Sequence, residues 1–311
     1  MAIYDCFTFY DELDILEFRL EMLYKYVDYF VLSELPYTYH GEKTEPVFKK
    51  NFSRFERYKA KIIYVTSEYS PEYKGYGDWE IEYWHRNCMI KGLSGCKPDD
   101  LIMISDVDEI PNPKILRNLD HVYVKPCLSK NFIRKILYIL GNYNRSQILN
   151  MIHVQRFKDV IQYAPVSFRQ RMFYYFLNCE AAKMDWRGTV VSRYDNLCMP
   201  EKLRELRGKL PVIENGGWHF SNFGGVQKLK SKLKNSMNDY SVDLIRNAQS
   251  IAKDDELIEK CICEGKDIFG RSGKEYHFEF ISPDQIGIKN INKKFPEYER
   301  YVHYSRQEQR R

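Results

Sequence analysis

The sequence predicts an α/β fold: a central, mostly parallel sheet flanked by helices, with a helical embellishment toward the C-terminus. Two observations support this. In the first third of the chain, short apolar runs alternate with helical patterns, which is typical of a parallel sheet covered on both faces. The 311 residues are 44% hydrophobic, so the chain can bury a full core. Because no repeat or low-complexity linker interrupts the sequence, we expect residues 1–311 to form a single domain.

The first third contains four predicted strands and the helices between them. The strands are the short apolar runs at residues 3–9, 29–33, 61–65 and 101–104. Leucines recur at helical spacing from Leu13 to Leu23, which indicates a helix after the first strand. Aromatic residues at 52–58 indicate a short helix, and residues 79–93 form a longer pattern with one apolar and one charged face.

The second half has longer strands and more helices. Residues 168–177 and 189–193 predict two strands, the first of them rich in aromatic residues. Pro200 suits the first turn of a helix ending near residue 207. Two further helices are expected at residues 226–234 and 254–264. The glycine-rich segment 215–225 is expected to be a loop.

Charge and composition narrow the class of ligand. The formal net charge of +5 suits a polyanion such as a nucleotide diphosphate, but it is too small, and too mixed with acidic residues, to indicate nucleic acid. The 25 tyrosines suit a cleft for sugars or bases, although a compositional bias of the genome explains them equally well. Eight cysteines without a CxxC pair indicate a reducing compartment. With no leader pattern and no apolar stretch near ~18 residues, we expect a cytoplasmic protein with at most peripheral membrane contact.

Acidic residues follow the apolar run at 101–104 directly. In an open parallel sheet, ligands bind outside the carboxyl ends of the strands, where Asp106 and Asp108 are expected to lie. Two residues apart in an extended segment, their side chains point the same way and can reach one cation. Hard divalent cations take oxygen ligands and share them with phosphates. The pattern predicts a metal site, and a solvated acidic turn is the plain alternative.

Phosphatases of the haloacid dehalogenase type also carry two aspartates in this pattern. In those enzymes the pair follows the first strand of the core, whereas here it follows the fourth predicted strand. No downstream lysine with a paired-aspartate motif is visible either. The sequence therefore does not favour a phosphatase.

Several separate motifs occur in order along the chain. They are YDCFTFYDELD at 4–14 with Glu17 and Arg19, VDYFV at 27–31, Trp79-Glu80, Arg86-Asn87, ISDVDEIP at 104–111, GGWHFS at 216–221 and GKDIF at 265–269. This set resembles glycosyltransferase family 17. The matches run from residue 4 to about residue 270, and their agreement in order and spacing makes the resemblance specific.

The resemblance implies a GT-A-like nucleotide-sugar fold, a divalent metal (usually Mn²⁺, otherwise Mg²⁺) and transfer of N-acetylglucosamine from UDP-N-acetylglucosamine, with inversion, to a glycan hydroxyl. It divides the chain into a nucleotide-binding half (1–125), an acceptor and lid half (126–270) and a C-terminal extension (271–311). Animal members of the family carry a membrane anchor and act in the Golgi lumen. Because no anchor is seen here, we expect a lipid-linked or surface glycan as the acceptor.

The same resemblance suggests the metal ligands. Asp106 and Asp108 are expected to hold the metal, and His219 to complete its coordination, since a late histidine often does so in GT-A enzymes. A packing role for His219 is the alternative. The glycines beside it let backbone approach a ligand closely, and Trp218 is expected to stack on a sugar or cover the site. We expect this segment to be a lid that orders on donor binding.

The nucleotide is expected to contact the ends of the first two strands. Phe9, Tyr10 and Glu12, at the end of the first, should border the uracil and ribose. Glu34 ends the second, where nucleotide-binding folds place an acid near the base or ribose. An ordinary loop acid is the alternative for Glu34.

Arg86 and Asn87 lie on the helix before the acidic cluster, where they are expected to contact the donor. The planar guanidinium of Arg86 matches phosphate geometry. It is equally able to pair with Glu82, one helical turn earlier.

Inversion requires a general base that takes the proton of the acceptor hydroxyl. Glu109 adjoins the acidic cluster, although strand alternation points it away from Asp108. Asp185, beside Trp186, and Asp239, after the glycine-rich segment, are the other candidates. The sequence does not choose among them.

Two other functions stay open. The first is a nucleotide-sugar-binding protein that has lost catalysis, which the intact Asp106, Asp108 and His219 argue against. The second is a sugar nucleotidyltransferase, which also needs an acid pair and a metal. Such an enzyme usually has a glycine-rich, basic loop after its first strand, whereas residues 9–12 here are acidic and contain no glycine.

Overall fold

The computed structural model describes residues 1–38, 41–68, 80–126, 153–235, 250–251, 253–271, 273–288, 291 and 300–303. Ten strands within these segments form one sheet: β1 (Ile3–Thr8), β2 (Tyr29–Glu34), β3 (Ile62–Thr66), β4 (Leu101–Asp106), β5 (Glu109–Pro111), β8 (Val166–Tyr174), β9 (Cys179–Glu180), β10 (Trp186–Arg193), β11 (Val212–Ser221) and β12 (Glu279–Phe280). A separate pair joins β6 (Tyr123–Val124) to β7 (Gln155–Arg156).

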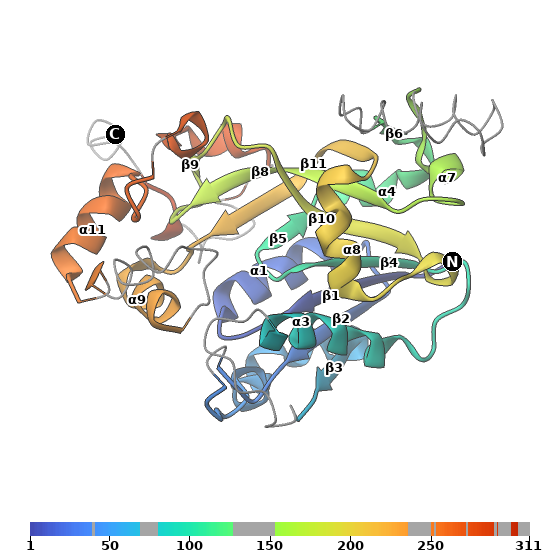
Figure 1. The fold of residues 1–311 in the computed structure, drawn as a ribbon, viewed down its shortest axis with the longest axis horizontal. Helices are drawn as coiled ribbons and strands as arrows, with labels where there is room; N and C mark the ends of the chain where they lie inside the picture. Colours follow the sequence, from blue (N-terminus) through green and yellow to red (C-terminus); the bar gives the residue numbers. More distant parts are fainter. Residues whose placement is uncertain are drawn as a thin grey trace.

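The described helices surround this sheet (Figure 1). The α-helices are α1 (Leu13–Leu23), α2 (Val47–Lys50), α3 (Glu80–Asn87), α4 (Pro113–Arg117), α7 (Phe157–Val160), α8 (Pro200–Leu206), α9 (Gly225–Asn235) and α11 (Asp255–Glu264). The 3-10 helices are η1 (Phe52–Lys61), η2 (Cys88–Leu93), η3 (Leu119–His121), η4 (Tyr194–Asn196), η5 (Arg207–Lys209), η6 (Lys274–Tyr276) and η7 (Pro283–Ile286).

The sheet is mixed, so the expectation of a mostly parallel sheet was wrong for the second half of the chain. Its order is β12-β9-β8-β10-β4-β1-β2-β3, with β11 beside β8 and β5 beside β11. The strands from β4 to β3 are parallel, whereas β10 runs antiparallel to both β4 and β8. Only short connections separate β8, β9 and β10. Connections of that length permit antiparallel pairing but not the crossover that parallel strands need.

The parallel half is covered by helices on both faces, as expected. In β1, Phe7 packs in a cluster with Leu16 of α1, while its neighbour Cys6 packs on the opposite face with Leu93 of η2 and Leu203 of α8. A strand buried on both faces is apolar throughout. This explains the continuous apolar runs from which these strands were predicted.

Residues 215–221 of the glycine-rich segment belong to a strand and only 222–224 form a turn, so the predicted loop, and a lid made of it, were wrong for most of this segment. The strand is β11, which pairs with β8 and with β5. A Cβ on Gly217 would lie 2.1 Å from the carbonyl oxygen of Ile110, and one on Gly216 would lie 2.6 Å from the Cβ of Phe168. Gly217 also has a φ of 142°. These glycines allow neighbouring backbones to approach closely rather than making the segment flexible.

His85 of α3 is a buried histidine whose ring Nε2 lies 2.7 Å from the carbonyl oxygen of Ser33. Burial lowers the pKa of His85 from 6.5 to about 4. Since the folded value lies below the unfolded one, the unfolded chain takes up this proton first as the pH falls. We expect the free energy of unfolding to fall by about 3 kcal/mol between pH 6.5 and pH 4 because of this residue.

The substitution His85→Gln is expected to remove this part of the pH dependence. His277→Gln, which changes a histidine that is 65% exposed, serves as the control and is expected to leave it unchanged. Urea unfolding at pH 7.5 and pH 4.5 measures both. Equal pH dependence in His85→Gln and the unaltered protein would contradict the assignment.

Candidate active site

A cavity of about 390 Å³ opens where β1, β4 and β11 end. These three strands point the same way, and ligands of open α/β sheets bind outside the carboxyl ends of such strands. The lining residues are Tyr10, Asp11, Glu12, Leu13, Asp14, Ile15, Arg54, Asp108, Phe220, Asn222, Phe223, Gly224, Lys228, Leu229, Ser231, Lys232 and Tyr301. Of the predicted acidic cluster, Asp108 thus borders a cavity large enough for a sugar.

The cavity walls combine flat apolar surfaces with charge. Phe223 and Tyr301 lie with their ring centroids 4.3 Å apart, and Phe220 stands next to Phe223. Lys228 and Lys232 lie one turn apart on α9 and add positive charge. Aromatic faces suit sugar rings, and ammonium groups suit phosphates.

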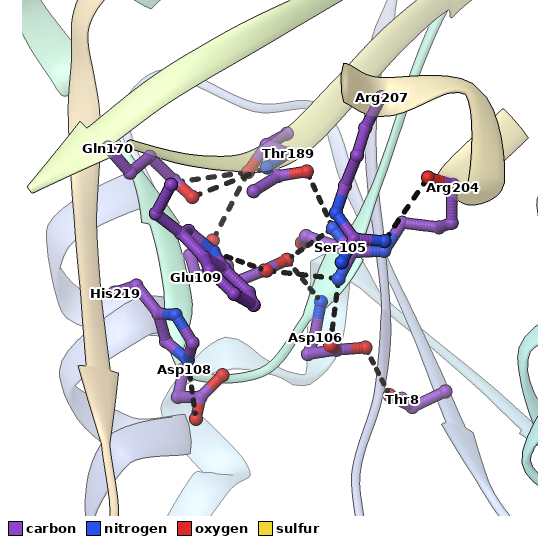
Figure 2. Close-up of polar contacts among 12 residues, drawn as sticks. Thr8, Ser105, Asp106, Asp108, Glu109, Gln170, Thr189, Arg204, Arg207 and His219 are labelled. Carbon is purple, nitrogen blue, oxygen red and sulfur yellow. Dashed lines mark hydrogen bonds and ion pairs between the residues drawn. The ribbon is translucent and has the colours of Figure 1, made fainter. Parts of the chain in front are cut away.

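Asp108 lies in the turn between β4 and β5 and faces His219 of β11 (Figure 2). Its Oδ2 is 3.3 Å from His219 Nε2. Burial raises the pKa of Asp108, but His219 and Lys232 outweigh it, so the pKa lies below its usual value. The ring of Trp186 lies 4.7 Å from that of His219. His219 Nδ1 is buried and has no hydrogen-bond partner among the described residues.

Asp106 ends β4 and points away from Asp108, toward Thr8 and Arg204 (Figure 2). Its Oδ1 accepts hydrogen bonds from Thr8 (3.3 Å) and Arg86 (3.0 Å), and its Oδ2 accepts one from Arg204 (2.9 Å). Burial opposes ionisation of Asp106, but the charges of Arg204 and Arg86 outweigh it and lower its pKa. The expectation that both aspartates point the same way was wrong, because a turn separates them.

Arg19 of α1 holds this turn in place. Its guanidinium donates to both carboxylate oxygens of Asp5, at 2.8 and 2.6 Å. Its Nη1 donates at 2.9–3.1 Å to three carbonyl oxygens of the turn, those of Asp106, Val107 and Glu109. Arg19 and Asp5 are both fully buried. The helix after β1 therefore fixes the backbone that carries Asp108.

Glu109, a candidate base, is 0% exposed. Arg204 donates to both of its oxygens, at 2.8 and 3.0 Å. Trp186 Nε1 donates at 2.9 Å, and so does the backbone amide of Asp106 at 3.0 Å. With its oxygens bonded in this way and no contact with the cavity, Glu109 positions Arg204 and Trp186.

Of the other two base candidates, Asp185 does not line the cavity and Asp239 cannot be placed. Asp185 has a side chain that is 55% exposed and pairs with Arg169 at 3.3 Å and Arg187 at 3.9 Å. Asp239 lies outside the described residues.

Some of the residues predicted to border the nucleotide or the sugar line the cavity, and others are buried in the core. Tyr10 and Glu12 line the cavity. Phe9 is buried in the core, with its ring 6.3 Å from that of Phe48. Trp218 is also buried, and its Nε1 donates to the carbonyl oxygen of Ile286 at 2.7 Å. Strand alternation places Trp218 on the face of β11 opposite His219, away from the cavity.

The other residues predicted to contact the nucleotide sugar form hydrogen bonds or ion pairs with groups of the protein instead. Glu34 accepts hydrogen bonds from the backbone amides at the start of α2 and from Tyr64. Arg86 pairs with Glu82 at 2.8 Å, with Asp106 and with Glu201. Asn87 accepts a hydrogen bond from the backbone amide of Glu201 at 3.0 Å. These side chains hold α2, α3 and α8 in place.

Sequence reasoning missed Lys228, Lys232 and Tyr301. The i, i+4 spacing of the two lysines on a predicted helix was a usable signal, since it places both on one face. Tyr301 carries no such signal. It reaches the site because its hydroxyl bonds to Asp14, 287 positions earlier.

The side chains of Asp108 and His219 suit a metal ion that also binds a substrate. Among the described residues, no group of three or more His, Cys, Asp or Glu side chains is placed to hold a metal ion by itself. The neighbouring Oδ2 of Asp108 and Nε2 of His219 fit two ligands of a cation that takes its others from phosphate oxygens and water. Asp106 would have to leave its arginines to join them.

Comparison with known proteins agrees with the motifs. The family model described as glycosyltransferase family 17 matches residues 1–164, more than half of the chain. The chain is similar to the human and rat proteins named β-1,4-mannosyl-glycoprotein 4-β-N-acetylglucosaminyltransferase, each 30% identical over 106 residues. These matches cover 32% of this chain and only 20% of each relative. In the described part of the chain, no helix has the length and apolarity needed to span a bilayer. The family match confirms the resemblance seen in the motifs: the chain belongs to glycosyltransferase family 17.

Proposed function

We propose that this chain is an inverting, metal-dependent glycosyltransferase of GT-A-like fold. It moves N-acetylglucosamine from UDP-N-acetylglucosamine to a hydroxyl of a glycan, lipid-linked or at a surface. The observation that carries the proposal is the position of Asp108. Directly after β4, Asp108 faces a cavity with aromatic, acidic and basic walls. The family and the names of the similar mammalian proteins support the type of transfer and the sugar.

The chain's own residues account for binding and for the departure of the nucleotide. Lys228 pairs with Asp11 at 2.6 Å, and the charge of Lys232 acts on Asp108. In this proposal the diphosphate binds beside both lysines, whose fixed positive charge would stabilise the negative charge that develops as it leaves. Phe223 and Tyr301 offer flat faces to the sugar ring.

Asp108 and His219 would hold the divalent cation, which would neutralise charge on the departing diphosphate as a Lewis acid. Asp106 forms ion pairs with Arg86 and Arg204 and keeps these two arginines in position. Trp186 packs against His219 and keeps the imidazole directed at Asp108.

A thermal-shift panel with Mn²⁺ tests the donor. UDP and UDP-N-acetylglucosamine are expected to stabilise the folded protein, by roughly 2.7 kcal/mol at ~100 times Kd, because a ligand of the native state alone shifts the unfolding equilibrium. GDP and CMP are the controls and are expected to have no effect. Equal stabilisation by GDP-mannose would contradict the uridine assignment.

A further inference from the structure

The acidic side chains of the cavity differ in what they already bind. Asp14 accepts hydrogen bonds from Arg54 at 2.6 Å and from Tyr301. Asp11 pairs with Lys228, and Asp108 faces His219. Carboxylates held by positive charges or by hydrogen-bond donors are weak proton acceptors, because these partners stabilise their charged form.

Glu12 is different. One of its oxygens, Oε2, accepts hydrogen bonds from the backbone amides of Tyr10 and Asp11, both at 3.1 Å. Its other oxygen, Oε1, receives no hydrogen bond or ion pair from the described residues. Glu12 is partly exposed and lines the cavity together with Asp108. The backbone thus orients this carboxylate and leaves one oxygen open to the cavity.

The position of Glu12 is fixed by the fold. It follows β1 and immediately precedes the first residue of α1, the helix whose Arg19 anchors the turn that carries Asp108. Glu12 and Asp108 therefore come from two adjacent strand ends that the same helix holds. A general base must be held at a defined position within reach of the acceptor hydroxyl. The strand end and the helix hold the carboxylate of Glu12 in this way.

We propose that Glu12 is the general base of the transfer, an inference that rests on the proposed function. The acceptor hydroxyl oxygen attacks the anomeric carbon of N-acetylglucosamine and forms the new C–O bond. The bond from that carbon to the β-phosphate oxygen breaks, and its electron pair leaves with UDP. The hydroxyl proton passes to Glu12 Oε1. The rings of Phe223 and Tyr301 border the same cavity.

The substitution Glu12→Gln tests this assignment. The amide oxygen still accepts the backbone hydrogen bonds of Tyr10 and Asp11, so the turn is expected to persist. With saturating UDP-N-acetylglucosamine and Mn²⁺, we expect kcat for transfer to a glycan acceptor to fall at least ~10²-fold, with Kd for the donor changed less than threefold. Azide needs no base to remove a proton, so it is expected to restore formation of the β-glycosyl azide. Glu21→Gln, the same change at a position of α1 whose side chain is 42% exposed, is the control and is expected to transfer normally.

Each outcome decides the assignment. Transfer by Glu12→Gln within threefold of the unaltered protein overturns Glu12 as the base, as does loss of donor binding or absence of azide rescue. Failure of the unaltered protein to transfer from any nucleotide sugar overturns the proposed function, and the base assignment with it. If Glu12→Gln does not fold, Glu12→Asp takes its place. It keeps the charge, draws the carboxylate back by one methylene, and is expected to lower kcat at least ~10-fold while leaving the donor Kd unchanged.

Discussion

Asp108→Asn is expected to lower turnover of UDP-N-acetylglucosamine at least ~10²-fold, a loss of about 2.7 kcal/mol of transition-state stabilisation. The amide keeps the size of the side chain but loses its charge, and an amide oxygen is a poorer ligand for a hard cation. The loss is expected to include the slow hydrolysis of donor without an acceptor. The fold is expected to persist, because the side chain lies at the edge of the cavity and not in the core.

Asp120→Asn, the same change at an exposed position of η3, is the matched control and is expected to keep full turnover. His219→Ala is expected to weaken the affinity for Mn²⁺ less than Asp108→Asn does, since it removes one neutral ligand and leaves the carboxylate. Turnover is measured by UDP release, and folding by circular dichroism. A folded Asp108→Asn with normal manganese-dependent turnover would refute the site.

Arg19→Met is expected to lower the free energy of unfolding by about 3–5 kcal/mol, the range for breaking one side of a buried ion pair. The change leaves the fully buried Asp5 without its cation and removes the hydrogen bonds of Arg19 to three carbonyl oxygens of the 106–109 turn. Because the same turn carries Asp108, turnover is expected to fall as well. Arg57→Met removes an arginine from an exposed pair with Glu17, and is expected to cost less than about 1 kcal/mol.

Urea unfolding at pH 7 measures the free energy of unfolding of Arg19→Met and Arg57→Met against that of the unaltered protein. If Arg19→Met does not fold, Arg19→Lys provides the measurement. It keeps the charge near Asp5 but lacks the planar fork that reaches both Asp5 and the turn. A loss below about 1 kcal/mol in either Arg19 variant would show that the turn is held by other contacts.

The parallel half of the fold was predictable because its residues carry a local signal. Residues 101–104 are apolar without interruption, since β4 is buried on both faces, and the acidic residues mark where it ends. The strand β11 was not predictable in this way. Gly216 and Gly217 favour a loop in any local pattern, and only the closeness of Phe168 and Ile110 explains why a strand needs them.

The sequence indicated which residues gather near the site better than it indicated what each of them does there. Asp108 and His219 do meet, but Asp106 belongs to an arginine network whose members lie as far apart in sequence as Arg86 and Arg204. Glu34 ends its strand where expected, yet both of its oxygens bind protein groups. A sequence shows that an acid is present, but which partner neutralises it depends on long-range packing.

Carbon-13 NMR of the reaction with UDP-N-acetylglucosamine labelled in its sugar tests the central claim most directly. The unaltered protein, Mn²⁺ and a panel of glycan acceptors are mixed with the donor, and the anomeric carbon is followed. We expect acceptor-dependent release of UDP together with a new anomeric signal of β configuration, inverted from the α-linked donor. A donor that stays intact with every acceptor while UDP binds would contradict the account in favour of a nucleotide-sugar-binding protein. Cleavage between the two phosphates, leaving the sugar phosphate, would contradict it in favour of a nucleotidyltransferase.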